Sequence, residues 1–243
     1  FRSEAIKNKD MIMKSLCALL LLSPTLLSPA FAANSVMIWP IDPAINPDEK
    51  ASELWLENRG NSTTLMQIRV FSWQQVSGQE QYQTQQQVVA SPPMVRMEPG
   101  QKQLVRLIKQ TPPAAGKELS FRAVLDEIPA PRNPGENQAG LTFQMRYSVP
   151  LFVYGSGLNT DSARPELRWQ QVSDGGKRWL QLTNSGSGHA RLSNVTIGGR
   201  RLGEGLYGYV LADSMHRWPL TSPVSGELSA EVNKRPWRSA AQK

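Results

Sequence analysis

The longest run of alternating residues in the chain, LTFQMRYSVPLFV at positions 141–153, decides the fold. Apolar side chains stand at every second position through residue 151, which is the period of a β-strand with one apolar face. The members of this apolar set are Leu141, Phe143, Met145, Tyr147, Val149 and Leu151. Alternation alone shows that this face is apolar and does not show what covers it.

Shorter runs rich in β-branched and aromatic residues continue the pattern on both sides of this strand. The strands expected before it are 52–57, 65–73, 88–89, 103–108 and 119–128, and those expected after it are 166–172, 179–183, 190–197, 207–211 and 227–232. No segment keeps a 3.6-residue period with a cap at each end, and turn signals recur about every 10–15 residues. The sequence therefore predicts an all-β fold of sandwich domains.

Two polar segments divide these strands. Gly155-Ser156-Gly157 follows the longest strand and predicts a domain boundary, with one β-domain at 33–154 and a second at 155–243. Residues 74–87 hold eight Gln in 14 positions, a composition that fits a solvated hairpin or a prion-like association segment. We expect the hairpin, with its Gln side chains on the wet face.

The first 32 residues read as an export signal preceded by upstream sequence. From Met13, the basic Lys14 leads into an apolar stretch at 16–22, and Ala30-Phe31-Ala32 supplies a small-x-small cleavage pattern. A membrane anchor is the less consistent interpretation, because the apolar run is short and prolines interrupt it. Removing the segment would leave 23 basic and 18 acidic residues, a formal charge of +5, and no cysteine.

Composition excludes several classes of protein. The 243 residues, 40% of them hydrophobic, have ordinary globular composition and not that of a disordered, collagen-like or coiled-coil chain. One Cys and two His are too few for a structural zinc site, and a charge of +7 does not by itself indicate nucleic acid. No second apolar stretch approaches 18 residues, so the mature protein should not be membrane-embedded.

Catalytic chemistry finds little support in the sequence. His189 and His216 are both expected in turns, and neither lies in a nucleophile-elbow or metal-ligand pattern. Gly198-Gly199 fits a hairpin turn and not a phosphate loop, because no strand–loop–helix context surrounds it. We therefore expect no catalytic residue, no metal, no cofactor and no enzymatic activity.

Four blocks together resemble the periplasmic chaperones of the chaperone–usher pilus systems. They are 91–101 with 105–107, then 121–129, 146–153, and 208–211 through 218–220. The blocks occur in the family's order and span most of the chain after the signal peptide. The first two are specific jointly, whereas any one block alone would be weak.

This resemblance implies a fold, a location and partners. The fold would be two immunoglobulin-like sandwiches set at an angle, with a cleft between them. The protein would work in the periplasm, bind pilus subunits whose sandwich lacks its last strand, and deliver them to an outer-membrane usher. It would lend the strand at 141–151, whose backbone pairs with the subunit edge while its alternating apolar side chains enter the open groove. When free, it would cap this strand by forming a homodimer, which is a further hypothesis.

One part of the family pattern is missing. The better-known branch anchors the subunit's C-terminal carboxylate with an Arg on the first strand and a Lys near the end of the lending strand. Here Pro150 stands where that Lys belongs, and the first strand, 36–43, has no Arg. Trp39-Pro40 and the R-x-S-x-P pattern at 146–150 resemble the archaic branch instead.

An anchor must therefore come from other cations. A carboxylate favours the bidentate fork of an arginine, and Arg122 and Arg146 lie in neighbouring strand blocks. We expect these two as the anchor, with Arg96 and Arg106 in reserve. Each arginine has the alternative role of a solvated or structural ion pair.

A different class of function also stays open, that of an exported adhesin or carbohydrate-binding module. Aromatic rings for sugar stacking are available at Trp39, Trp55, Trp73, Trp169, Trp179, Trp218 and Trp237. Most of them lie inside strand patterns, where tryptophan more often belongs to a core.

Overall fold

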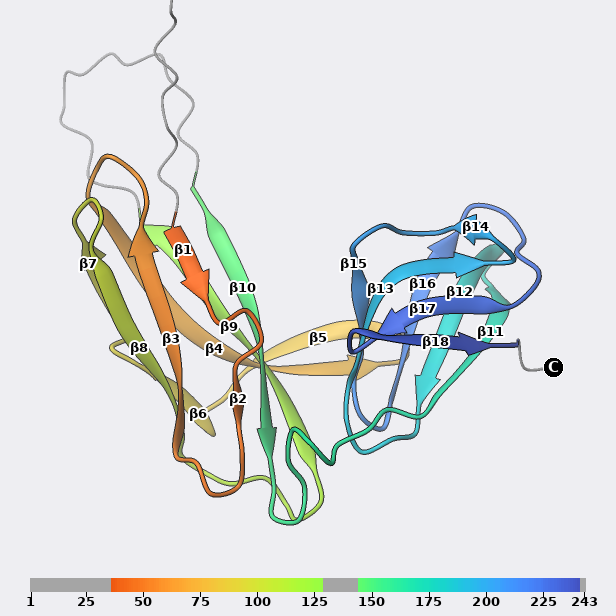
Figure 1. Ribbon diagram of the computed structural model, residues 1–243, viewed down its shortest axis with the longest axis horizontal. Coiled ribbons are helices and arrows are strands. Elements are labelled where there is room, and N and C mark those ends of the chain that lie inside the picture. Colours follow the sequence, from red (N-terminus) through yellow and green to blue (C-terminus); the bar gives the residue numbers. More distant parts are fainter. Residues whose placement is uncertain (1–35, 129–143, 241–243) are drawn as a thin grey trace, which may run out of the picture. The chain divides into compact units, whose positions relative to one another are not determined.

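The computed structural model describes residues 36–128 and 144–240, and it is built of strands (Figure 1). Four sheets form two sandwiches, which confirms the all-β prediction. The proposed signal peptide, and Leu141 and Phe143 of the alternating set, fall outside these residues. Within the described ranges, no helix is long and apolar enough to cross a membrane.

The first sandwich packs a four-stranded sheet against a six-stranded one. The four-stranded sheet has the order β1 (Val36–Trp39), β3 (Ala51–Asn58), β8 (Lys102–Lys109) and β6 (Val88–Ser91). The other has the order β2 (Ala44–Ile45), β10 (Arg146–Tyr154), β9 (Glu118–Ile128), β4 (Thr64–Val76) and β5 (Gln79–Thr84), with β7 (Met94–Met97) also pairing with β4. Its core includes Leu54, Met66, Leu107, Phe121 and Leu151.

The second sandwich is built in the same way from the rest of the chain. One sheet has the order β11 (Leu167–Asp174), β12 (Lys177–Asn184) and β16 (Ser214–Leu220). The other has the order β14 (Arg200–Arg201), β13 (Ala190–Ile197), β17 (Leu228–Val232) and β18 (Arg235–Ser239), with β15 (Leu206–Val210) also pairing with β13. Its core includes Trp169, Leu180, Leu192 and Val210.

A third apolar cluster joins residues of the two sandwiches. It contains Trp73 of β4, Phe152 and Tyr154 of β10, and Tyr209 and Leu211 at the end of β15. Strands that belong to different sheets therefore share buried side chains at this point. The proposed boundary at 155 lies between β10 and β11, and it stays a proposal.

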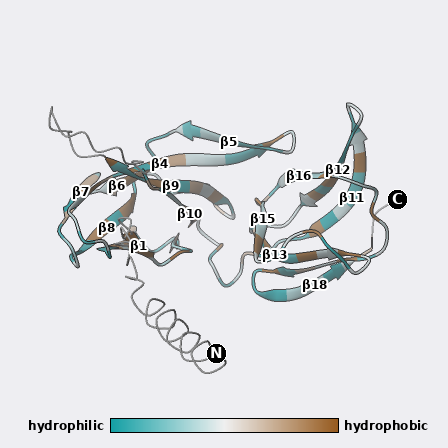
Figure 2. Ribbon diagram, turned by 90° about the horizontal axis from the view of Figure 1, so that it is seen from above, coloured by the Kyte–Doolittle hydropathy of each residue, from teal (hydrophilic) through white to brown (hydrophobic). Residues whose placement is uncertain are grey.

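The polar hairpin at 74–87 is a hairpin, as expected. Strands β4 and β5 join through Ser77 and Gly78, and β5 is hydrophilic along most of its length (Figure 2). The tip of the hairpin contacts strand β16. Gly78 pairs in parallel with His216, and the Gly78 carbonyl accepts a hydrogen bond from the Arg217 backbone N–H at 3.2 Å. A Cβ on Gly78 would lie 2.8 Å from Cγ of Arg217, and its φ is +79°, so the contact needs glycine.

Most of the predicted strands are present, with ends shifted by a few residues. The prediction for His216 was wrong, because this residue lies inside β16 and not in a turn. The segment has no clear apolar alternation, and pairing with β12 along its whole length makes it a strand. His189 does lie in the connection before β13, and Gly198-Gly199 is the turn between β13 and β14.

Candidate functional site

Strand β10 has two halves that differ in exposure. Residues 149–154 are all buried, with Val149, Leu151 and Val153 in the core of the first sandwich. Towards the start of the strand, Arg146 and Ser148 are exposed, and Met145 just before it is 39% exposed. The apolar face therefore leaves its own core at Tyr147, which is partly buried and accepts a hydrogen bond from the Val36 backbone on its hydroxyl at 3.1 Å.

The backbone of β10 has an unpaired edge beside its exposed half. The Glu127 N–H donates to the Met145 carbonyl at 3.0 Å, so the odd-numbered residues turn their backbone groups towards β9. The even-numbered residues, Arg146, Ser148 and Pro150, then turn theirs away from β9. Among the described strands, only β2 pairs on that side, and it reaches no further than Phe152 and Val153.

Pro150 has a defined place on this edge. A proline has no N–H to donate, so strands tolerate it where the missing donor would have faced solvent. At residue 150 that direction is the free edge, and the pairing with β9 continues undisturbed on both sides. The edge of β10 therefore offers donors only at Arg146 and Ser148 before the strand meets β2.

The structure divides the predicted lending strand. Met145 and Tyr147 lie at the exposed half, whereas Val149 and Leu151 are 6% and 0% exposed and fill the first sandwich. The structure thus shows core filling for Val149 and Leu151, and it leaves Met145 largely outside that core. Leu141 and Phe143 belong to the part of the set outside the described residues.

Arg122 lies on the outward face of the six-stranded sheet, next to Pro150 and Phe71 on the neighbouring strands. Its guanidinium carbon is 3.8 Å from the centre of the Trp73 ring and 5.3 Å from that of Tyr209. Its Nε is buried and has no hydrogen-bond partner among the described residues. Burial raises the pKa of the nearby Tyr82 hydroxyl, as does Glu80, and Arg122 opposes the rise.

Arg146 is held differently. Its Nε donates to Asp126 at 2.5 Å, and Arg69 donates to the other oxygen of the same carboxylate at 2.6 Å. Arg146, with a smaller contribution from Arg69, holds the pKa of Asp126 below its ordinary value against the opposing effect of burial. The Arg146 side chain is 67% exposed, so this pair lies at the surface. The reserve candidate Arg96 is likewise exposed and paired, with Glu98 at 3.1 Å.

Polar side chains of β4 and β5 surround Trp73. Its indole N–H donates to the Glu80 carboxylate, and Gln75 donates to the other Glu80 oxygen at 3.0 Å. Gln75 also donates to the Tyr209 carbonyl at 2.8 Å and accepts from the Leu211 N–H at 2.9 Å. One buried amide thus pairs with the backbone of the second sandwich and fixes Tyr209 beside Trp73.

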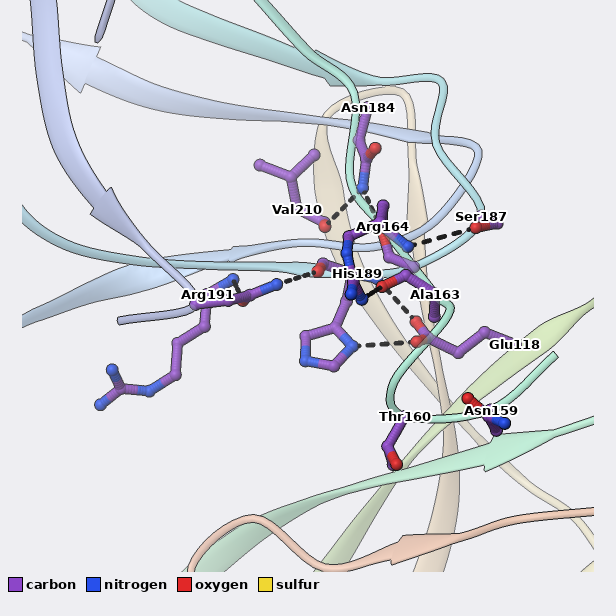
Figure 3. A network of polar contacts seen from close by, with 12 residues as sticks. Glu118, Asn159, Thr160, Ala163, Arg164, Asn184, Ser187, His189, Arg191 and Val210 are labelled. Atoms are coloured by element: carbon purple, nitrogen blue, oxygen red, sulfur yellow. Dashed lines mark hydrogen bonds and ion pairs between the residues drawn. The ribbon is translucent and has the colours of Figure 1, made fainter. Parts of the chain in front are cut away.

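A second polar contact joins Glu118, the first residue of β9, to the loop before β13 (Figure 3). The buried Glu118 carboxylate accepts from the His189 backbone N–H at 2.9 Å and lies 3.0 Å from ring atom Nδ1 of the same residue. The His189 ring is stacked on Phe152, with centroids 3.4 Å apart. Burial, and then Glu118, raises the pKa of Tyr154. The C-terminal end of β10, at Phe152 and Tyr154, is therefore surrounded by packed and hydrogen-bonded side chains, whereas the start of the strand has an unpaired backbone edge.

These surroundings were not foreseen from the sequence. Trp73 was one of seven tryptophans, most of them inside strand patterns, and nothing in the spacing of Trp73, Tyr82 and Tyr209 connects them to Arg122. The only signal was the polar hairpin itself, whose Gln-rich pattern is interrupted by Glu80. Over the two described ranges, no three His, Cys, Asp or Glu side chains lie close enough to hold a metal ion.

Comparisons with known proteins agree with this geometry. Residues 43–159 match the family described as pili and flagellar-assembly chaperone, PapD N-terminal domain. No curated protein sequence matches the chain significantly.

Several solved structures are similar to the chain. One is the archaic chaperone CsuC, from the CsuC–CsuE chaperone–tip adhesion subunit pre-assembly complex of Acinetobacter baumannii Csu pili. It is 32% identical, with 86% of this chain and 100% of that chain covered and a TM-score of 0.74.

Two other structures show the same fold at lower identity. The E. coli chaperone DraB is 17% identical, with coverages of 86% and 98% and a TM-score of 0.62. A chain from the Salmonella enterica complex of SafA pilin with the SafB chaperone is 18% identical, with coverages of 85% and 96% and a TM-score of 0.63. The identity and complete coverage of CsuC, together with the match over the first sandwich, show that this chain belongs to the PapD family of chaperones, which assemble pili in the chaperone–usher pathway.

Proposed function

We propose that this pilus chaperone works in the periplasm, captures subunits whose sandwich lacks a strand, and delivers them to the outer-membrane usher. Capture uses donor-strand complementation, in which an extended segment adds to the open edge of the subunit. The unpaired edge of β10 beside Met145 is the single observation that carries this proposal. Relatives support it, because CsuC was solved with the tip subunit CsuE and SafB with the pilin SafA.

The lending segment is the part of the alternating set that leaves the chaperone's own core. Leu141, Phe143 and Met145 are the side chains that enter the subunit groove, and Tyr147, which packs partly against the chaperone's own core, ends this segment. Val149 and Leu151 keep the strand anchored in the first sandwich, because a side chain cannot fill two cores at once. The outward backbone groups of Arg146 and Ser148 pair with the subunit edge, and Pro150 ends the run of donors.

Arg122 is the better candidate for holding the subunit's C-terminal carboxylate. Arg146 already pairs with Asp126, which it shares with Arg69, so part of its charge is compensated. No carboxylate of the described residues forms an ion pair with Arg122, and its Nε lacks a partner. A carboxylate arriving there would gain a charge-assisted contact that the free protein does not satisfy.

Co-purification tests the proposal directly. We expect a chaperone expressed with the subunits encoded beside it to carry a stoichiometric small secreted subunit from the periplasm. Export of the mature protein beginning near residue 33 is checked on the same sample by its N-terminal sequence. A chaperone that stays without a subunit, or that binds a glycan instead, contradicts the proposal and favours the carbohydrate-binding alternative.

The same edge supports a proposal about the free protein. Without a subunit, two copies would pair their β10 edges and cover the apolar segment, because an unpaired edge is a template for strand addition. Sedimentation over a wide concentration range should detect a dimer that dissociates when subunit is added. A monomer at all concentrations contradicts this part and leaves the capture proposal intact.

A further inference from the structure

We propose that Trp73 and Tyr209 are positioning residues that hold Arg122 ready for the subunit's C-terminal carboxylate. This inference rests on the proposed anchor role of Arg122. It adds that the anchor is built by both sandwiches, since Trp73 lies on β4 and Tyr209 on β15. We call the two rings the aromatic cage of Arg122.

The geometry of the cage fixes the guanidinium without neutralising it. The Arg122 guanidinium lies 3.8 Å from the Trp73 ring centre, and the rings of Trp73 and Tyr209 meet edge to face at 79° with centroids 5.3 Å apart. A cation is attracted to the face of an aromatic ring and keeps its full charge there. A carboxylate partner would also have held the arginine but would have offset its charge, as Asp126 does in part for Arg146.

The cage is itself held in place. Trp73 is 2% exposed and donates its indole N–H to Glu80, so the ring has little freedom to turn. Tyr209 is 7% exposed, and its backbone carbonyl accepts from the side chain of Gln75 at 2.8 Å. Because Gln75 and Trp73 lie two residues apart on β4, one strand fixes both walls.

The conformational entropy of the Arg122 side chain explains why the anchor needs the two aromatic rings. A long flexible arginine loses conformational entropy when a ligand orders it, and preorganisation removes that cost from binding. The Nε atom of Arg122 makes no hydrogen bond to the described residues, so the aromatic faces take over its orientation. A side-chain hydrogen bond also joins Arg122 to the Tyr82 hydroxyl, so the N–H groups left for a carboxylate are those that Tyr82 does not use.

A comparison of two forms of one ligand separates positioning from folding. The probe is the pilus subunit encoded beside the chaperone, prepared once with a free C-terminal carboxylate and once with a C-terminal amide. Affinity for both forms is measured for the wild type and for Trp73→Leu, Tyr209→Leu and Arg122→Ala. Tyr207→Leu is the matched control, because Tyr207 packs on Trp218 in the second core and not on Arg122.

We expect the wild type to prefer the carboxylate form and Arg122→Ala to lose that preference. Trp73→Leu and Tyr209→Leu should each weaken binding of the carboxylate form by about 2- to 30-fold, the range of one cation–π contact, and leave the amide form unchanged. Tyr207→Leu should leave the preference at its wild-type value.

Two results overturn the inference, and they can be told apart. If the cage variants weaken both forms equally, Trp73 and Tyr209 act through folding alone and do not position Arg122. If the wild type does not distinguish the two forms, the carboxylate anchor itself fails, and the cage has no role in capture. Should Trp73→Leu fail to fold, Trp73→Phe keeps a weaker ring face and must give an intermediate preference; an unchanged preference would count against the cage.

Discussion

The two halves of β10 share one alternating pattern and have different surroundings. In the second half, Val149, Leu151 and Val153 lie in the core of the first sandwich and are almost completely buried. At Met145 and Tyr147 the same face is only partly covered, and the backbone edge alongside is unpaired among the described strands. The comparison shows that one strand can be part of a core along one half and leave an apolar face and a backbone edge uncovered along the other, with the change between residues 147 and 149.

The largest effect is expected from a substitution in the buried half of β10. Leu151→Ala should lower the free energy of unfolding by about 2–5 kcal/mol, because it leaves a cavity in a fully buried site. Subunit capture should fall with it. Urea denaturation checks this, with Met145→Ala as the control that stays within about 0.5 kcal/mol of the wild type. A Leu151→Ala protein that keeps its stability and loses only capture would mean that this half, too, serves the partner.

Substitutions in the proposed lending segment should have the opposite effect, because they should weaken subunit capture and leave the stability of the free chaperone nearly unchanged. Changing Phe143 and Met145 to Asp should weaken capture by more than about 30-fold, because two apolar side chains are lost from the groove and charges take their place. The free energy of unfolding of the isolated chaperone should change little, since Met145 is 39% exposed. Binding assays and urea denaturation are run on the same preparation. Undiminished capture would remove this segment from the interaction.

A smaller effect is expected from Pro150, at the junction of the halves. Pro150→Ala gives the outward edge a third donor, worth about 0.5–1.5 kcal/mol once paired. Self-association of the free chaperone should then tighten by up to about 10-fold, as measured by sedimentation. Unchanged or weaker self-association would show that the free protein does not pair along this edge.

The smallest expected effect is the loss of stability at low pH that comes from Asp126 and its two partners, Arg69 and Arg146. The pKa of Asp126 is lowered in the folded state, first of all by Arg146, so its contribution to stability is present above the unfolded pKa of about 3.9 and is lost as pH falls through the folded value. Between about pH 5 and pH 3, the wild type should lose slightly more stability than Asp126→Asn. Urea denaturation across this range measures the difference. Identical slopes would mean that the two arginines do not stabilise the carboxylate.

Much of the fold was readable from the sequence. Alternation along 119–128 and 146–153 predicted the adjacent strands β9 and β10, and the four blocks predicted the family, which the identity to CsuC confirms. Family membership also confirms the expectation of a non-enzymatic protein. Segments with no clear alternation were missed, above all β16 and β18, because neighbouring strands and not their own pattern make them strands.

The candidate site was only partly readable. A period of two shows which side chains share a face and not what covers that face, so it could not separate Val149 from Met145. The difference between Arg122 and Arg146 depends on Asp126 and Trp73, which are brought beside them by strand register and not by spacing in the sequence. Such contacts become visible only when the sheets are assembled.

Residue-resolved amide hydrogen exchange on β10, with and without a captured subunit, tests the central claim most directly. The amides of Val149 and Leu151 point towards β9 and should be protected in both states, whereas those of Arg146 and Ser148 point to the free edge. We predict that Arg146 and Ser148 exchange rapidly in subunit-free monomer and become strongly protected on capture. Rapid exchange of both amides in the complex would contradict the account, because the subunit would then be held without pairing to this strand.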